Sequence, residues 1–319
     1  MAWNIQAAVD AAISAAVQDA NGQIATLQTA NAGLQSQLTA LNQALQAEKQ
    51  KVLNLETALA ACEAGQPAPD PDPVPTPPPS TTFPDSSNTG PTGTLTNMSG
   101  TQTLSTAGAV FENKNLSGNI VVRADNVTIR NCKITCSAYH AIQNANNKGL
   151  KVLNCEINGQ GATNNGIYGP GTFQGNDIYG VENGFNTWGS SGDKTDISGN
   201  YVHALKNAGS PHYDGIEING GTDITIKNNT VIVDYGQTAA LMLNNYFGGL
   251  ARITADGNKF VGGGYTVYCD NSFSGGSVDG STINITNNKL GKGYWGYWAL
   301  YSSGARTSGN TDLNTGAAV

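Results

Sequence analysis

Two carboxylates and a histidine lie close together in the segment Ser210-Pro-His-Tyr-Asp-Gly-Ile-Glu217. Glycoside hydrolysis uses a pair of Asp or Glu side chains, one as acid and one as base or nucleophile, so Asp214 and Glu217 suit that reaction by residue type. His212 and His203 could assist as general acids near pH 7, although exposed loop histidines without a catalytic role are more common.

The residue pattern gives little support to metal chemistry. Asp214, Glu217 and Asp234 are conceivable Ca²⁺ ligands, but nothing like a twelve-residue acidic loop surrounds them. Three histidines and five cysteines without a CxxC pair exclude an obvious zinc site. The odd number of cysteines also argues against a full disulfide framework. We therefore expect no metal and no other cofactor.

The elements that would position these residues are set by a repeated phrase of alternating apolar residues that ends at Asn or Cys. It is clearest in residues 127–134, 150–157, 224–231 and 283–290. The pivot falls at Cys132, Cys155, Asn176, Asn200, Asn229, Asn258, Asn288 and Asn310, a period of 21 to 30 residues. That period is typical of a solenoid and leaves no room for a helix, so we predict a parallel β-helix with the pivots stacked at roughly 4.8 Å. A thiol packs as a small hydrophobe, so Cys can replace Asn.

A second set of segments is in register with the first: His140-Ala-Ile-Gln143, Asn165-Gly-Ile-Tyr168, Asn183-Gly-Phe-Asn186, Asp214-Gly-Ile-Glu217, Ala239-Ala-Leu-Met242, Tyr265-Thr-Val-Tyr268 and Trp298-Ala-Leu-Tyr301. Seven rungs would therefore contain two strands each. The apolar third member should point inward and the fourth outward, which makes the fourth positions our candidate ligand face. Because Asp, Asn or His begins four segments, Asp214 has an alternative role as a turn residue that accepts backbone N–H bonds.

Aromatic residues suggest what that face binds, because their rings stack well on sugars at little entropic cost. Tyr294-Trp-Gly-Tyr-Trp298 is the densest aromatic run, and Trp295 and Trp298 could instead cap the end of the solenoid. Longer insertions contain further exposed candidates, including Phe247. The predicted carbohydrate-binding residues are Tyr168, Asn186, Trp188, Glu217, Tyr246, Tyr268 and Tyr301.

The N-terminal residues follow a heptad pattern between positions 13 and 62, which predicts a left-handed coiled coil and self-association. Mixed Val, Ile and Leu at the a positions favour a trimer, whereas Asn31 at a position a is also found in dimers. Glu48 at a d position departs from the pattern, and Cys62 could either cross-link neighbours or pack as a small core residue. The predicted oligomerisation residues are Ile24, Leu27, Asn31, Leu34, Leu38, Leu41, Leu45, Val52, Leu55 and Leu59.

Composition divides the chain into a stalk (1–65), a proline-rich linker (66–95) and a solenoid (96–319). The net charge of −7 and the scattered Lys and Arg residues argue against nucleic acid as a partner. No apolar run reaches 18 residues, so we expect no membrane insertion. The N-terminus also lacks the charged and apolar regions of a signal peptide.

A stalk, a proline spacer and a β-solenoid without a secretion signal together resemble a bacteriophage tail spike or tail fibre. The strand–Asn repeat is similar to that of the pectate-lyase-like superfamily. The resemblance implies a mainly β fold, a right-handed parallel β-helix with an N-terminal α-helical coiled-coil stalk. It also implies a protein of the virion surface, made in the host cytoplasm and released by lysis. The N-terminus would then bind other virion proteins, and the β-helix would bind host cell-surface carbohydrate.

Residues 210–216 are also similar to the Ser-Pro-Asn-Thr-Asp-Gly-Ile segment of polygalacturonase-type β-helix hydrolases. The Asp before Gly is catalytic in that family, which by resemblance points to Asp214, with Glu217 and His212 as possible partners. This chain lacks the family's adjacent Asp-Asp pair, its Gly-His-Gly and its Arg-Ile-Lys. We therefore place carbohydrate binding first. A polysaccharide-depolymerising hydrolase or lyase and a purely architectural decoration protein without a ligand are the alternatives.

Overall fold

The computed structural model describes residues 9–10, 13–19, 21–23, 82–144 and 147–319. The chain forms two compact units, Met1–Pro78 and Pro79–Val319. In the first unit the described residues are helical, and the side chains of Ile13 and Val17 are 58% and 52% exposed. The predicted oligomerisation residues from Ile24 to Leu59 lie outside the described residues. No helix in the described ranges is long and apolar enough to cross a membrane.

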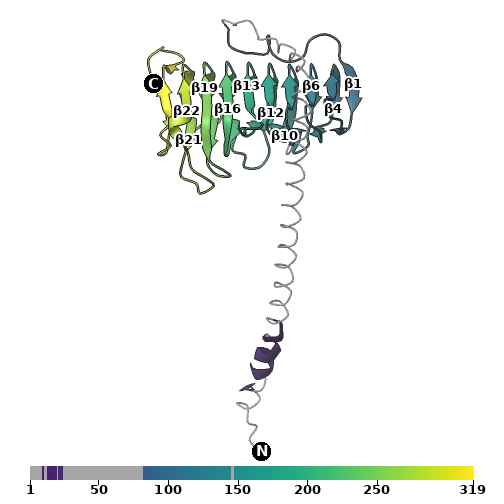
Figure 1. Cartoon of the computed structure of the whole chain (residues 1–319), viewed down its shortest axis with the longest axis vertical. Coiled ribbons are helices and arrows are strands. Elements are labelled where there is room, and N and C mark those ends of the chain that lie inside the picture. Colours follow the sequence, from purple (N-terminus) through teal and green to yellow (C-terminus); the bar gives the residue numbers. More distant parts are fainter. Residues whose placement is uncertain (1–8, 11–12, 20, 24–81, 145–146) are drawn as a thin grey trace, which may run out of the picture. The chain divides into compact units, whose positions relative to one another are not determined.

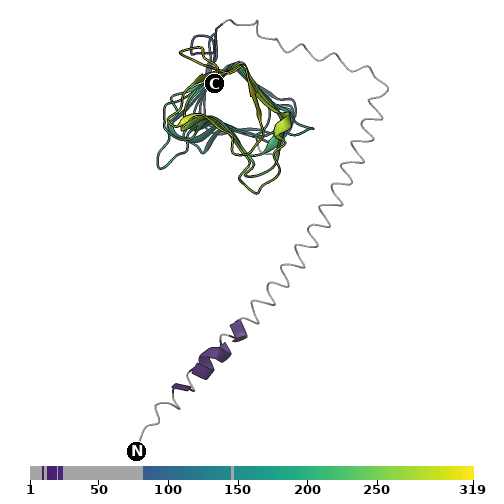
Figure 2. The same cartoon turned by 90° about the vertical axis from the view of Figure 1, so that its left-hand side faces the viewer.

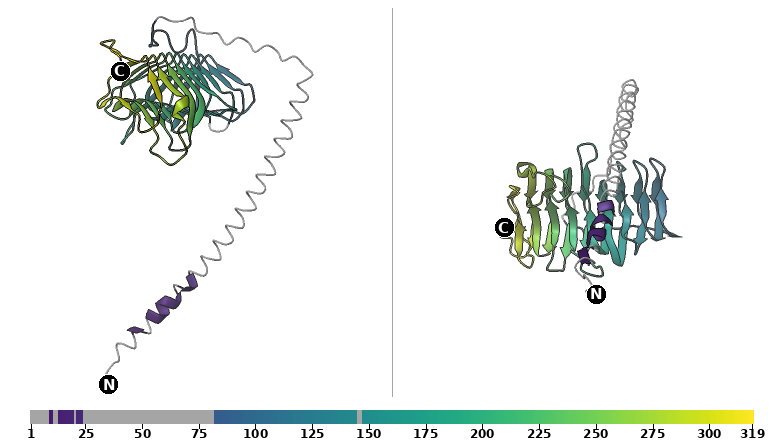
Figure 3. Two further views of the ribbon diagram at one scale, coloured as in Figure 1. Left: turned by 60° about the vertical axis from the view of Figure 1, so that its left-hand side comes forward. Right: turned by 90° about the horizontal axis from the view of Figure 1, so that it is seen from below.

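The second unit is mainly β and consists of two long parallel sheets, as the repeats predicted (Figures 1 and 3). This architecture is consistent with a parallel β-helix. One sheet has nine strands, each of which pairs in parallel with the equivalent strands of the neighbouring rungs. These strands are β3 (Val110–Glu112), β6 (Thr128–Arg130), β9 (Lys151–Leu153), β11 (Thr172–Gln174), β13 (Thr195–Ser198), β16 (Gly221–Lys227), β19 (Leu250–Asp256), β22 (Ile283–Thr286) and β25 (Arg306–Ser308).

The other sheet has seventeen strands in two columns, joined where two long strands run through both. The first column contains β1 (Thr96–Ser99), β4 (Lys114–Ser117), β7 (Lys133–Thr135), the starts of β10 (Glu156–Tyr168) and β12 (Asp177–Asn186), β14 (Tyr201–His203), β17 (Thr230–Val233), β20 (Lys259–Gly262), β23 (Lys289–Gly291) and β26 (Thr311–Asp312). The second column contains β2 (Gln102–Leu104), β5 (Ile120–Val122), β8 (His140–Gln143), the ends of β10 and β12, β15 (Asp214–Ile218), β18 (Ala239–Asn244), β21 (Tyr265–Asp270) and β24 (Gly296–Ala299). A short 3₁₀ helix, η1 (Gly280–Thr282), precedes β22.

A full rung therefore contains three strands, and the expectation of two was wrong. Each repeated phrase is divided by its pivot, so that β6 ends at Arg130 and β7 begins at Lys133. The residue before the pivot has a left-handed backbone conformation, as at Asn131 with φ of 51° and Gly175 with φ of 66°. Asn and Gly tolerate this conformation best, so every pivot from Cys132 to Asn310 is preceded by one of them. The turn residues thus define the corner between the two sheets.

The predicted ladder at this corner is confirmed, since every pivot is buried. The Nδ2 atom of Asn176 donates to Oδ1 of Asn200 at 2.8 Å, and the same bond links each following pair at 2.9 Å, ending at Asn310. Cys132 and Cys155 occupy the two preceding rungs and are also fully buried. Inward apolar side chains fill the rest of the interior, including Phe173, Phe185 and Phe260. Figure 2 looks along the stack and shows successive rungs nearly superimposed.

The predicted linker spans two kinds of region. Residues 66–81 lie outside the described residues, whereas residues 82–95 belong to the second unit. The Gly90 N–H donates to Gly175 O at 2.9 Å, and the Thr92 N–H donates to Asn131 Oδ1 at 2.7 Å. The end of the predicted linker is thus hydrogen-bonded to the corner that contains the ladder.

Candidate functional site

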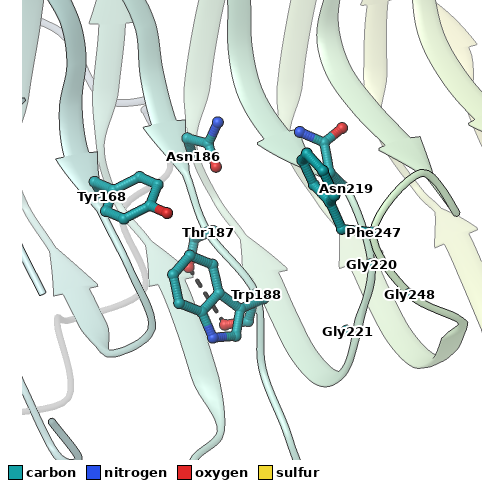
Figure 4. Close-up of a pocket in the computed structure, with 9 residues that line it drawn as sticks. All are labelled: Tyr168, Asn186, Thr187, Trp188, Asn219, Gly220, Gly221, Phe247 and Gly248. Carbon is teal, nitrogen blue, oxygen red and sulfur yellow. Dashed lines mark hydrogen bonds between the residues drawn. The ribbon is translucent and has the colours of Figure 1, made fainter. Parts of the chain in front are cut away.

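A pocket of about 370 Å³ opens on the outer surface of the second column, where β10, β12 and the loops after β15 and β18 meet (Figure 4). Its lining includes three of the predicted carbohydrate-binding residues: Tyr168, Asn186 and Trp188. The other lining residues are Thr187, Asn219, Gly220, Gly221, Phe247 and Gly248. The structure thus brings together an outward strand position and two insertions that are distant in the sequence.

Strand register and hydrogen bonds fix the aromatic side of the pocket. Tyr168 pairs with Asn186 across β10 and β12, and its ring meets that of Trp188 edge-on with the centroids 5.3 Å apart. The Thr187 hydroxyl donates to Gly169 O at 2.8 Å, which anchors the backbone where Trp188 leaves the sheet. His140 stacks on the other side of Tyr168 at 4.3 Å, and burial lowers the pKa of this histidine to about 4. His140 is therefore neutral at physiological pH.

Glycines let the opposite wall approach closely. Gly220 and Gly221 have φ angles of 129° and 131°, and a Cβ on Gly220 would lie 2.6 Å from Gly248 N. The Phe247 N–H donates to Asn219 O at 2.7 Å, which holds the Phe247 loop beside the pocket. Phe247 itself is 78% exposed. The pocket therefore has one aromatic wall packed against the sheet and one exposed aromatic ring at its edge.

Glu217 lies next to the pocket in the register position after Asn186 and is held by three amides. Its Oε2 atom accepts from Asn183 Nδ2 at 3.0 Å and from Asn186 Nδ2 at 2.6 Å, and its Oε1 accepts from Asn219 Nδ2 at 2.8 Å. We call these four residues the Glu217 amide network. Burial raises the pKa of the Glu217 carboxyl. The network fixes the orientation of two pocket amides, those of Asn186 and Asn219.

Asp214 belongs to a second stack of polar side chains. Asn183 Nδ2 donates to Asn165 Oδ1 at 3.3 Å, the Asp214 N–H donates to Asn183 Oδ1 at 3.1 Å, and the Ala239 N–H donates to Asp214 Oδ1 at 3.1 Å. Asp214 is only 3% exposed, and burial followed by the nearby Glu217 charge raises its pKa well above the ordinary range. This geometry matches the turn-residue alternative, in which the side chain accepts a backbone N–H of the next rung.

The glycine of the Asp-Gly-Ile segment also has a packing explanation. A Cβ on Gly215 would lie 2.1 Å from Val231 Cγ1 and 2.8 Å from Ala240 O. Gly166 and Gly184, at the equivalent positions of the two preceding rungs, are equally confined. The similarity to the hydrolase segment therefore coincides with a position where this solenoid has no space for a side chain.

The two histidines proposed as acids lie in different places. His212 is exposed, and its backbone N–H donates to Glu182 Oε1 at 3.1 Å. His203 lies in the first column, where its Nε2 is 2.9 Å from Asp177 Oδ1 and its ring stacks on Tyr201 at 4.1 Å. The structure thus brings His212, but not His203, to the second-column loops.

Glu182 is a site residue that sequence reasoning missed. Its Oε2 accepts from Asn164 Nδ2 at 2.6 Å and from Asn207 Nδ2 at 2.9 Å. Its charge is one of the causes that raise the pKa of both Asp214 and Glu217. An acidic residue directly before the Asn183 segment was the available signal, but only the stacking of rungs places it beside the segment that contains His212.

The remaining predicted aromatics are spread along the same side. Tyr246 packs edge-on against Phe247 at 4.6 Å, next to the pocket. Tyr268 pairs with Met242 in the outward column, and burial raises its pKa to about 12. Tyr301 is out of register, because Tyr268 pairs with Ala299 and β24 ends there, so its predicted strand position was wrong. Its ring nevertheless lies 6.2 Å from that of Tyr268.

The aromatic run near the C-terminus divides between two positions. Trp298 lies in β24, the last strand of the second column, and packs partly buried against the core. Trp295 instead lies over the preceding rung, since a Cβ on Gly264 would be 2.4 Å from its ring. Covering of the column end by Trp298 matches the capping alternative, whereas Trp295 covers the side of the sheet.

Among the described residues, no three His, Cys, Asp or Glu side chains gather where they could hold a metal ion. Asp214, Glu217 and Asp234 therefore do not form the conceivable Ca²⁺ site. Cys132, Cys136, Cys155 and Cys269 are buried free thiols. No protein-family model, curated protein or solved structure matches this chain. The case for a ligand rests on the pocket, its aromatic rings and the Glu217 amide network.

Proposed function

We propose that the outer surface of the second column binds carbohydrate, with the 370 Å³ pocket as its central subsite. The observation that supports this most is the lining itself: three aromatic residues, Tyr168, Trp188 and Phe247, surround the Asn186 and Asn219 amides. Aromatic faces bury the apolar faces of sugar rings, and a few oriented polar groups bond the hydroxyls.

The test is binding to a glycan array, followed by titration calorimetry with the best oligosaccharide. Trp188→Ala should weaken binding at least tenfold, which corresponds to about 1.4 kcal/mol. Tyr294→Ala is the matched control, because Tyr294 is 79% exposed but does not line the pocket. Equal losses in both variants, or binding by neither the variants nor the parent chain, would contradict the proposal.

The wider proposal is a bacteriophage virion protein, a tail spike or fibre in which a right-handed parallel β-helix is presented to host cell-surface glycan. It would be made in the host cytoplasm and released by lysis, with its N-terminus bound to other virion proteins. Supporting this are the parallel solenoid, the heptad pattern and the proline-rich segment. Immunogold labelling of lysate particles tests it, and labelling confined to the cell envelope would argue for another location.

We further propose that residues 13–62 form a coiled coil, a trimer rather than a dimer. In the described helix, the seam residues Ile13 and Val17 are more than half exposed, as expected for a surface that another chain covers. Light scattering on the full chain should give three times its mass of 33.0 kDa. Removal of residues 1–65 should give a monomer, and a monomeric full chain would rule out the coiled coil.

Hydrolysis is the second candidate function, because Asp214 and Glu217 both have raised pKa values, as a general acid needs. Against it, the Asp214 carboxylate is buried and already accepts the Ala239 N–H. A reducing-end assay on the bound polysaccharide decides between them. Activity that Asp214→Asn abolishes while binding persists would establish the enzyme. A purely architectural protein would bind none of the glycans.

A further inference from the structure

The Glu217 amide network determines which atoms the pocket presents to a ligand. The Nδ2 atoms of Asn186 and Asn219 both point toward Glu217, at 2.6 and 2.8 Å. Asn219 Oδ1 accepts from Asn244 Nδ2 at 2.6 Å. In the described part of the chain no donor reaches Asn186 Oδ1, and Figure 4 shows this oxygen on the side of Thr187 and Trp188. The amide nearest the pocket therefore offers an acceptor and not a donor.

The charge around the pocket has one sign. None of the nine lining residues is Lys, Arg or His, and Glu217 forms no ion pair with Lys or Arg among the described residues. Glu182 and Asp214 add two further carboxyl groups on neighbouring positions of the same surface. The Tyr168 hydroxyl and the Trp188 Nε1–H are donors, but neither is charged. A ligand anion would thus meet a partly buried carboxylate without a compensating cation.

From these two observations we infer that the pocket selects uncharged sugars and rejects acidic ones. A neutral pyranose has hydroxyl protons to give to Asn186 Oδ1 and an apolar ring face to stack on Trp188 or Phe247. A carboxylate on the sugar accepts hydrogen bonds only, and it would be repelled by Glu217 in a surface region of reduced dielectric. This inference rests on the proposed carbohydrate binding and specifies its ligand class.

The experiment uses the full chain and pairs of glycans that differ only by oxidation at C6: galactose against galacturonic acid, and glucose against glucuronic acid, each as oligosaccharides. We expect the neutral member of a bound pair to bind at least tenfold more tightly. Acidic members that bind equally well or better would overturn the inference and leave the carbohydrate-binding proposal intact. Absence of binding to every glycan would instead overturn the proposed function.

Glu217→Gln tests the role of the network. A glutamine has a single acceptor oxygen, so it cannot accept from all three amides, and at least one amide N–H becomes free to face the ligand. The preference for the neutral sugar should fall at least fivefold. Glu112→Gln is the control, because Glu112 lies in β3 and pairs with Arg130 at 2.6 Å, away from the pocket. An unchanged preference in folded Glu217→Gln protein would refute the assignment of selectivity to Glu217.

Discussion

Replacing Asn229 with alanine should destabilise the solenoid, because this side chain occupies the middle of the buried ladder. Its Nδ2 donates to Ile197 O at 2.8 Å and to Asn258 Oδ1 at 2.9 Å. Its Oδ1 accepts from the N–H and the Nδ2 of Asn200, both at 2.9 Å. All these groups are buried in the corner between the sheets.

The magnitude follows from what remains after the substitution. Asn200 Nδ2 keeps Phe173 O, and Asn258 Oδ1 keeps the backbone N–H of residue 229. The Asn200 N–H and Ile197 O lose their bonds to the side chain. A buried polar group left unsatisfied costs about 1–3 kcal/mol, so two such groups give an expected loss of about 2–5 kcal/mol in the free energy of unfolding.

Urea unfolding of the full chain measures this loss, and hydrogen exchange locates it. Because solenoid rungs interact with their neighbours, faster exchange should concentrate at the rungs of Asn200 and Asn258. Asn284→Ala is the matched control: Asn284 lies in β22, is half-buried, and its side chain forms no hydrogen bond in the described part of the chain. Equal stability of the two variants would refute the argument that the ladder stabilises the corner.

Three further predictions concern individual positions. Cys155→Asn should be tolerated and should raise the melting temperature by thermal scan, because Asn176 is already placed to extend the ladder; a loss above about 2 kcal/mol would contradict this. Gly215→Ala should cost about 1–3 kcal/mol through overpacking, whereas Gly192→Ala, which has open space, should be neutral by urea unfolding. Burial raises the pKa of Asp214, so stability from its neutral form is complete below about pH 4 and is lost as pH rises through the folded pKa. Asp214→Asn should therefore raise the melting temperature at pH 8 but hardly at pH 4, and a lower value at pH 8 would count against it.

Local pattern was sufficient to predict the solenoid. Alternating apolar residues specify strands, and recurring Asn or Cys pivots specify where rungs stack, since identical buried turns satisfy one another's hydrogen bonds only in register. The pivots from Cys132 to Asn310 and the outward position of Tyr168, Asn186 and Glu217 were therefore predictable. The third strand of each rung was not, because a pivot inside a short apolar phrase does not reveal that the chain turns there.

The candidate site depended on tertiary structure. Trp188 and Phe247 were recognisable as exposed aromatics, but only the stacking of rungs brings their insertions to one pocket. Asp214 resembled a catalytic residue by its neighbours in sequence, and only the fold showed its carboxylate bonded to the Ala239 N–H. The sequence by itself determined the repeat and its inward and outward faces, because these depend on residue periodicity. Tertiary structure decided the pocket and the Glu217 amide network, because they depend on contacts between loops and rungs whose spacing no local pattern encodes.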